Sequence, residues 1–298
     1  MRLFKIQYME ALGNNFIVID SITQNFHFSL VSEEIIPIFN SKEDFVWRLA
    51  GKEEDFHEFD QILVIETPEK EFADFSVKIF NQDGSEAENC VNGMRCVARY
   101  LSDRNISVSD TVKLLVGSNL VTVEKNKNDF IVENIFSLSP SEIGLNDTEQ
   151  VFEIEFDNKK IPCFAVSIGN PHAVIFNDEL SLDVQEFGTF LQERNFFKNG
   201  VNVGFIQIKN AQEINLRVFE RGVGETQACG SGACAAAIAC AIQKELDKEL
   251  KINFHQGQVF TKVDLSDSKV LLKGTAEYRR EDVVINLQGG GRRPNETF

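Results

Sequence analysis

Residues 228–242 read ACGSGACAAAIACAI, and the fold can be inferred by starting from this segment. A cysteine stands in a turn of small residues, and a run of small apolar side chains follows it. Alanine-rich segments favour helix, so the sequence predicts a helix over 230–246. A helix that is apolar on nearly all sides must be enclosed by other elements rather than lie on a surface.

The first half of the chain contains the same arrangement of a turn cysteine followed by a helix. Residues 89–93 read NCVNG, and the helix-forming segment 94–101 follows them. The sequence therefore predicts a second buried helix over 92–103. One such turn in each half indicates an architectural duplication, although the two halves share few identical residues outside the turns.

Most of the remaining chain is typical of strands, because β-branched and aromatic residues recur in short alternating runs. Strands are predicted at 4–9, 16–22, 61–67, 75–80, 112–116, 120–123, 130–135, 151–156, 163–166, 173–176, 203–208, 214–219, 250–254, 259–265, 270–276 and 282–287. Shorter helices are predicted at 32–39, 43–50 and 183–194.

These elements predict an α+β fold of two pseudo-symmetric domains, each a curled mixed β-sheet wrapped around a central helix. The polar stretch 137–150 is typical of a linker. The predicted domains are therefore residues 1–136, which carry Cys90, and residues 137–298, which carry Cys229. The final strand is free to return to the first domain, and residues 289–294 predict a frayed tail.

The composition excludes several classes of protein. With 43% hydrophobic residues and 26 Phe, 298 residues suffice for two cores. A net charge of −16 and a pI near 4.8 argue against a nucleic-acid partner. No apolar run approaches the roughly 18 residues of a membrane span, and residues 1–13 lack the apolar core of a signal peptide. We expect a cytoplasmic protein without a membrane partner, whose six cysteines are thiols.

The two turn cysteines suit acid and base chemistry. A helix start offers unpaired N–H groups and the positive end of the macrodipole, which lower the pKa of a thiol and hold a carboxylate. Because a thiol titrates near pH 8.5, roughly neutral conditions allow one thiolate and one thiol, as two-base inversion of a stereocentre requires. From spacing alone, the favoured alternative is that Cys90 and Cys229 are structural or form a disulfide, since buried free cysteines are common.

Neighbouring residues favour the chemical interpretation. Glu220 and Arg221 precede Cys229 in a glycine-rich turn, and an acid with a guanidinium suits the ammonium and carboxylate of an amino acid. Asn stands next to Gly in two further segments, 12–16 and 167–172, and two residues from Gly in a third, 200–204. Singly each predicts a turn, whereas together they supply neutral amides for a dipolar ligand. His172 either assists proton handling or caps its turn.

At these positions the sequence resembles the diaminopimelate epimerase family, pyridoxal-independent enzymes that interconvert LL- and meso-diaminopimelate. The matching residues span most of the chain in the family's order: Leu12-Gly13-Asn14, Asp60-Gln61, Asn81 through Cys96, Ser167 through His172, Val201-Asn202 and Glu220 through Cys234. The resemblance implies the family's two-domain fold, diaminopimelate as substrate, a place in lysine and peptidoglycan synthesis, no cofactor, no metal and a homodimer.

The resemblance also implies residue roles. Cys90 and Cys229 would be the two bases, with Cys229 accepting the α-proton of the LL isomer and Cys90 donating one to the opposite face. His172 and Glu220 match positions that support catalysis. The implied substrate-binding residues are Asn14, Gln61, Asn81, Val91, Asn92, Asn170, Asn202, Glu220, Arg221, Gly230 and Ser231, with the amides of 91–92 and 230–231 holding the reacting carboxylate.

Four departures from the family pattern bear on the substrate. Val91 replaces the usual glycine, and valine disfavours positive φ. Glu10-Ala11 replaces His-Gly, Asn15 replaces an Asp, and Glu54–Phe59 replaces a glycine-rich approach to Asp60-Gln61. A related cofactor-independent racemase acting on another amino acid is therefore the first alternative.

Two alternatives belong to other classes of protein. A zinc or redox protein would use Cys90 with Cys96 and Cys229 with Cys234, but these spacings are not the C-x₂-C of zinc ribbons or thioredoxin-like motifs. A catalytically silent amino-acid-binding protein would keep the amides and Arg221 without needing paired cysteines.

Overall fold

The computed structural model describes residues 3–24, 31, 35–48, 52–87, 89–145, 149–177, 182–194 and 196–286. The chain forms two compact units, Met1–Lys125 with Ala276–Phe298, and Asn126–Thr275. The division lies between residues 125 and 126 rather than at the predicted 136/137, because the strand at 129–135 pairs with the strand at 269–274 in the second unit. The final strand returns to the first unit.

The first unit is a mixed sheet with the strand order β17-β1-β2-β3-β4-β5-β6. Its strands are β1 (Leu3–Ala11), β2 (Asn14–Asp20), β3 (Gln61–Glu66), β4 (Phe75–Asn81), β5 (Thr111–Val116), β6 (Asn119–Asn126) and β17 (Glu277–Asn286). Helix α3 (Val91–Asp103) packs against β1, β2 and β3. Most of its side chains are buried, as the sequence predicts for an enclosed helix.

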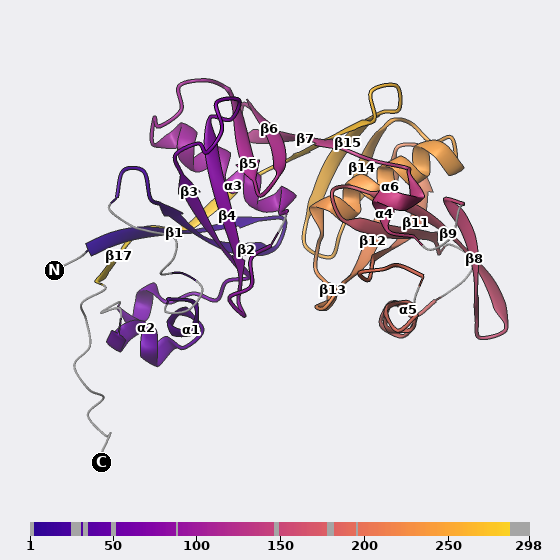
Figure 1. Cartoon of the computed structure of the whole chain (residues 1–298), viewed down its shortest axis with the longest axis horizontal. Coiled ribbons are helices and arrows are strands. Elements are labelled where there is room, and N and C mark those ends of the chain that lie inside the picture. The colour runs from indigo at the N-terminus through magenta and orange to yellow at the C-terminus, as the bar shows by residue number, and fades with distance from the viewer. Residues whose placement is uncertain are drawn as a thin grey trace, which may run out of the picture. The chain divides into compact units, whose positions relative to one another are not determined.

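The second unit is also a mixed sheet, with the order β8-β9-β10-β11-β12-β14-β15-β16-β7 and β13 paired to β12. Its strands are β7 (Asp129–Ile135), β8 (Val151–Phe156), β9 (Lys159–Ser167), β10 (Pro171–Phe176), β11 (Asn202–Asn210), β12 (Glu213–Glu220), β13 (Gly224–Thr226), β14 (Glu249–Asn253), β15 (Gln258–Asp264) and β16 (Lys269–Gly274). Helix α6 (Gly230–Gln243) packs against strands on several sides (Figure 1).

Strand directions show that the two units share one plan. From β1 to β6 the neighbouring pairs are antiparallel, parallel, antiparallel, parallel and antiparallel. The same series recurs from β9 through β10, β11, β12 and β14 to β15. In each unit the buried helix connects the two strands of the second parallel pair. The predicted fold, in which a sheet wraps around a central helix once in each of two units, is confirmed.

The smaller helices differ slightly from the predicted ranges. They are α1 (Ile36–Phe39), α2 (Lys42–Arg48), the 3₁₀ helix η3 (Glu53–Asp55), α4 (Pro140–Ile143) and α5 (Val184–Gln192). Helix α4 begins with Pro140 inside the stretch predicted as a linker, where proline is favoured at the first helical turn. The predicted tail at 289–294 lies outside the described residues.

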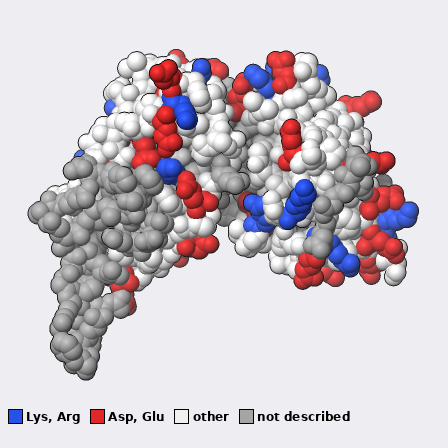
Figure 2. Space-filling view, viewed as in Figure 1, with Lys and Arg blue, Asp and Glu red and all other residues white. Residues whose placement is uncertain are grey.

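The described helices include none with the length and hydropathy needed to cross a membrane. On the face drawn in Figure 2, acidic and basic side chains of the coloured residues are interspersed, without a continuous basic area.

Candidate active site

The two turn cysteines have the same local geometry in their respective units. Each is the N-cap of its helix, Cys90 with φ −152° and ψ 92° and Cys229 with φ −140° and ψ 118°. Each sulfur accepts a hydrogen bond from the third residue after it: Gly93 N lies 3.3 Å from Cys90 Sγ, and Gly232 N lies 3.4 Å from Cys229 Sγ. The cysteines thus use the capping geometry of serine or aspartate, with sulfur as acceptor.

Both of those third positions are glycines at which a side chain would make close contacts. A Cβ at Gly93 would lie 3.2 Å from Cys90 Sγ and 3.0 Å from Leu63 Cδ1. A Cβ at Gly232 would lie 3.4 Å from Cys229 Sγ and 3.0 Å from Val218 Cγ2. In each unit, therefore, a side chain at this position would contact both the cysteine sulfur and a side chain of the neighbouring strand.

The departure at Val91 does not disturb the helix start. Val91 is the first residue of α3 and is absent from the described residues with positive φ, so its backbone has the helical sign that valine tolerates. Its side chain is buried. The first amides of a helix have no intrahelical carbonyl partner, and the predicted carboxylate donors at 91–92 and 230–231 are these first amides in α3 and α6.

In each unit the predicted polar residues lie at the ends of their strands, on the side of the sheet from which the buried helix begins. Their places are equivalent: Asn14 starts β2 and Asn170 precedes β10, Gln61 starts β3 and Asn202 starts β11, and Asn81 ends β4 and Glu220 ends β12. The register supports the match, because Gln61 lies opposite Phe16 while Asn202 lies opposite His172 in the corresponding parallel pairs. The pseudo-symmetry thus extends from the cysteines to the predicted substrate groups.

In the first unit these side chains form two short amide networks. Gln61 Nε2 donates to Asn81 Oδ1 at 2.8 Å, and Asn81 Nδ2 donates to Ser85 Oγ at 3.0 Å. Asn92 Nδ2 donates to Asn14 Oδ1 at 2.7 Å. Hydrogen bonds of this kind fix which end of each amide is a donor.

In the second unit Glu220 lies next to the Cys229 thiol. Thr226 Oγ1 donates to Glu220 Oε1 at 2.6 Å, and the carboxylate also accepts a hydrogen bond from the thiol. Burial and then the Glu220 charge raise the pKa of Cys229 well above its ordinary value, although the Ser231 hydroxyl and the Gly232 amide act to lower it. The expected lowering by the helix start is therefore outweighed here, because desolvation disfavours the thiolate.

Arg221 and His172 are held by neighbouring predicted residues. Arg221 N donates to Asn202 Oδ1 at 2.9 Å, and its Nη1 donates to Asn199 O at 2.7 Å while the side chain stays exposed. His172 is buried, and its Nε2 lies 3.1 Å from Asn170 Oδ1. Because the amide oxygen only accepts, Nε2 carries the proton of a neutral imidazole.

The His172 environment predicts acid sensitivity. Burial, aided by the Arg221 charge, lowers the pKa of His172 to about 3. A depressed folded pKa means that the stabilisation is complete above the unfolded pKa of about 6.5 and is lost as pH falls towards 3. Urea unfolding should show that the wild type loses up to about 1.4 kcal/mol per pH unit relative to His172→Gln in this window. The exposed His255→Gln is the control, and equal pH slopes for wild type and His172→Gln would contradict the prediction.

The departures at Glu10 and in segment 54–59 carry contacts that sequence reasoning missed. Glu10 Oε1 accepts from Gly13 N at 2.5 Å and Glu10 Oε2 pairs with Arg279 at 3.2 Å, which fixes the turn before Asn14. Asp55 pairs with Arg280 at 3.0 Å. Adjacent Arg279 and Arg280 on β17 thus hold two segments that lead to predicted substrate residues. Both arginines lie between the predicted strands 270–276 and 282–287, so the strand pattern gave no signal for these pairs.

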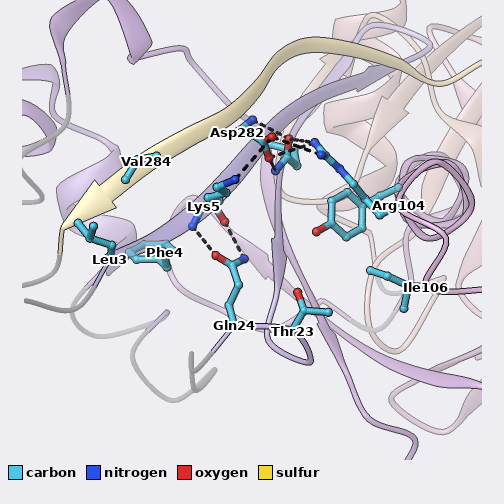
Figure 3. A pocket seen from close by; sticks show the side chains of 11 residues that line it. Leu3, Phe4, Lys5, Thr23, Gln24, Arg104, Ile106, Asp282 and Val284 are labelled. Atoms are coloured by element: carbon cyan, nitrogen blue, oxygen red, sulfur yellow. Dashed lines mark hydrogen bonds and ion pairs between the residues drawn. The ribbon is translucent and has the colours of Figure 1, made fainter.

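A separate cavity of about 480 Å³ in the first unit contains none of the predicted site residues (Figure 3). Its charges pair with one another, since Arg104 Nη2 lies 3.0 Å and Lys5 Nζ lies 3.8 Å from Asp282.

None of the six cysteines, all of which lie among the described residues, is in a disulfide. The described residues contain no group of three or more His, Cys, Asp or Glu arranged to hold a metal, so the zinc alternative has no ligand set among them.

Comparison with known proteins gives a family and a fold. The sequence model described as diaminopimelate epimerase matches residues 7–135 and 164–279. Among solved structures, a hydroxyproline epimerase from Agrobacterium vitis has a TM-score of 0.67 at 12% identity, covering 97% of this chain and 94% of that one. A probable proline racemase from Agrobacterium radiobacter K84 has a TM-score of 0.63 at 12% identity, covering 98% and 94%. A Bacillus anthracis phenazine biosynthesis protein of the PhzF family has a TM-score of 0.58 at 15% identity, covering 94% and 98%.

Proposed function

The chain belongs to the diaminopimelate epimerase family, and we propose that it interconverts LL- and meso-diaminopimelate without pyridoxal. The observation that carries the proposal is the pair of matched cysteines. Each cysteine is the N-cap of the buried helix in its unit, and each sulfur accepts a hydrogen bond from a glycine N–H. The strands around the two helices follow the same order of parallel and antiparallel pairs. Inversion at one carbon is served by two acid/base groups, one that removes a proton from one face and one that supplies a proton to the other.

The proposed reaction moves one proton at each face of the substrate α-carbon. One cysteine thiolate takes the α-proton and becomes a thiol, while the other thiol gives its proton to the opposite face and becomes a thiolate. Following the family resemblance, Cys229 accepts from the LL isomer and Cys90 donates, with the roles exchanged in reverse. Helix-start amides and their dipoles would stabilise the negative charge that develops on the carboxylate.

Glu220 has a specific part in this proposal. The raised pKa of Cys229 favours its thiol, which is the donor form needed for the meso-to-LL direction. For the opposite direction the thiol must first lose its proton, and we assign the Glu220 carboxylate, which accepts its hydrogen bond, as the base for that step. Glu220 and Arg221 also supply the charges that would bind an ammonium and a carboxylate of the substrate.

The first alternative is a related racemase for another amino acid. It is favoured by the segments at Glu10 and 54–59, which differ from the family pattern and make their own contacts. A catalytically silent binding protein is less favoured, because it would have no need of two matched cysteines. We also propose a homodimer, on the family resemblance alone, and a cytoplasmic location, since a thiol pair of this kind needs a reducing compartment.

The test is to incubate purified enzyme with LL-diaminopimelate in D₂O and to follow meso product and deuterium at the α-carbon. We expect interconversion with incorporation of one solvent deuteron per inversion. Proline, hydroxyproline, glutamate and lysine serve as a matched panel. Inversion of a panel member in preference to diaminopimelate would overturn the proposed substrate and favour the racemase alternative.

A further inference from the structure

Arg95 is an unusual residue in the core of the first unit. It lies on α3 one turn after the Cys90 cap, it is 1% exposed, and it is the largest of the fully buried side chains among the described residues. Enclosing a guanidinium costs far more than enclosing an apolar side chain of the same volume. A packing role alone would be served better by methionine or leucine, so the charge calls for another explanation.

The contacts of Arg95 lead towards the predicted substrate groups. Arg95 Nη2 donates to Asn92 Oδ1 at 2.7 Å, and Asn92 is itself 2% exposed. Asn92 Nδ2 in turn donates to Asn14 Oδ1 at 2.7 Å. Asn14 is only partly buried and stands at the sheet edge where α3 begins. A buried cation is therefore joined through one buried amide to a partly exposed amide.

The direction of these hydrogen bonds follows from the chemistry of the groups. A side-chain amide can turn by half a rotation and exchange its donor and acceptor ends, whereas a guanidinium can only donate. Arg95 thus requires the oxygen of Asn92 to face it, and the nitrogen of Asn92 then faces Asn14. The oxygen of Asn14 is used inside this chain, which leaves its NH₂ group to donate to a ligand.

We infer that Arg95 is a positioning residue that sets the polarity of the Asn92–Asn14 relay, so that Asn14 presents a hydrogen-bond donor to an acceptor oxygen of the substrate. The inference rests on the proposed function for the identity of that substrate. An oriented NH₂ group suits a carboxylate, and an amide free to turn would present its own oxygen part of the time and repel the same carboxylate.

The test uses three replacements that separate charge, donation and volume. Arg95→Met fills the space without a donor, Arg95→Gln brings an amide of undefined direction, and Arg95→Lys keeps a group that only donates. We expect kcat/KM to fall roughly 10- to 100-fold in Arg95→Met and Arg95→Gln, the range for a lost charge-assisted hydrogen bond, mainly through KM. Arg95→Lys should stay within a few-fold of wild type.

Two controls distinguish this role from general damage. Arg99→Met alters the next turn of α3, where Arg99 instead pairs with Asp103 and Glu277, and should leave KM unchanged. If Arg95 acts through Asn14, adding Arg95→Met to Asn14→Ala should cost less than about 3-fold more. Full additivity, or equal losses in Arg95→Met and Arg95→Lys, would overturn the inference.

A readout that needs no substrate tests the relay independently of the proposed function. In ¹⁵N-labelled protein, the side-chain NH₂ signals of Asn92 should be shifted and slow to exchange in wild type and Arg95→Lys, and should lose both properties in Arg95→Met. Unchanged Asn92 signals in Arg95→Met would overturn the inference even if the enzyme is active. A protein that inverts no amino acid, yet shows the predicted Asn92 changes, would overturn the proposed function and retain the relay.

Discussion

Replacing either Cys90 or Cys229 with alanine is expected to lower the interconversion of LL- and meso-diaminopimelate by about a thousandfold, within the range for loss of a positioned acid or base. Each thiol serves one face of the α-carbon in the proposed reaction. Removing one therefore leaves a proton that can be taken but not replaced from the opposite side. The measurement is the rate of isomer conversion by chiral chromatography.

Deuterium incorporation gives a sharper version of the same prediction. In D₂O, Cys90→Ala retains Cys229 and should exchange the α-proton of the LL isomer without forming meso product. Cys229→Ala should show the mirror behaviour, exchanging the inverted centre of the meso isomer only. Cys163→Ala removes a buried thiol from the middle of β9 that is not among the predicted site residues, and this variant should invert normally. Undiminished conversion in Cys90→Ala or Cys229→Ala would contradict the two-thiol mechanism.

Local signals allowed much of the fold to be predicted. Small residues around Cys90 and Cys229 marked both helix starts, and the apolar segments after them marked both buried helices. The repeated order of parallel and antiparallel strand pairs could not be predicted in the same way. It depends on contacts between segments far apart in the chain, such as β12 with β14 across the whole of α6, which short patterns do not encode.

The candidate site shows the same limit. The sequence predicted which residues stand near the two helix starts, and the structure brings Gln61 to Asn81 and Asn92 to Asn14 within the first unit. It did not predict the raised pKa of Cys229, because burial opposes the helix start and its extent depends on the surrounding sheet. Nor did it predict that Arg279 and Arg280 would pair with Glu10 and Asp55 from the opposite end of the chain.

Replacing Glu220 with glutamine is expected to reduce kcat about 100-fold in the LL-to-meso direction, because the thiol of Cys229 loses the base beside it. The substitution keeps a hydrogen-bond acceptor for Thr226 but removes the negative charge. Since that charge raises the pKa of Cys229, the pKa should fall in the variant. The two effects separate in a pH profile, because loss of the base lowers the rate at pH values where Cys229 is still a thiol, whereas the lower pKa moves the midpoint.

The sign of the shift can be stated for each direction. LL-to-meso conversion needs the Cys229 thiolate, so its rate rises with pH, and in Glu220→Gln this rise should begin at lower pH. Meso-to-LL conversion needs the thiol, so its alkaline decline should also begin at lower pH. Glu225→Gln is the matched control, because Glu225 pairs with Arg217 at 2.7 Å. It should leave both midpoints unchanged. Glu220→Gln with wild-type midpoints would mean that burial alone keeps Cys229 protonated, and that Glu220 does not control the proton on that sulfur.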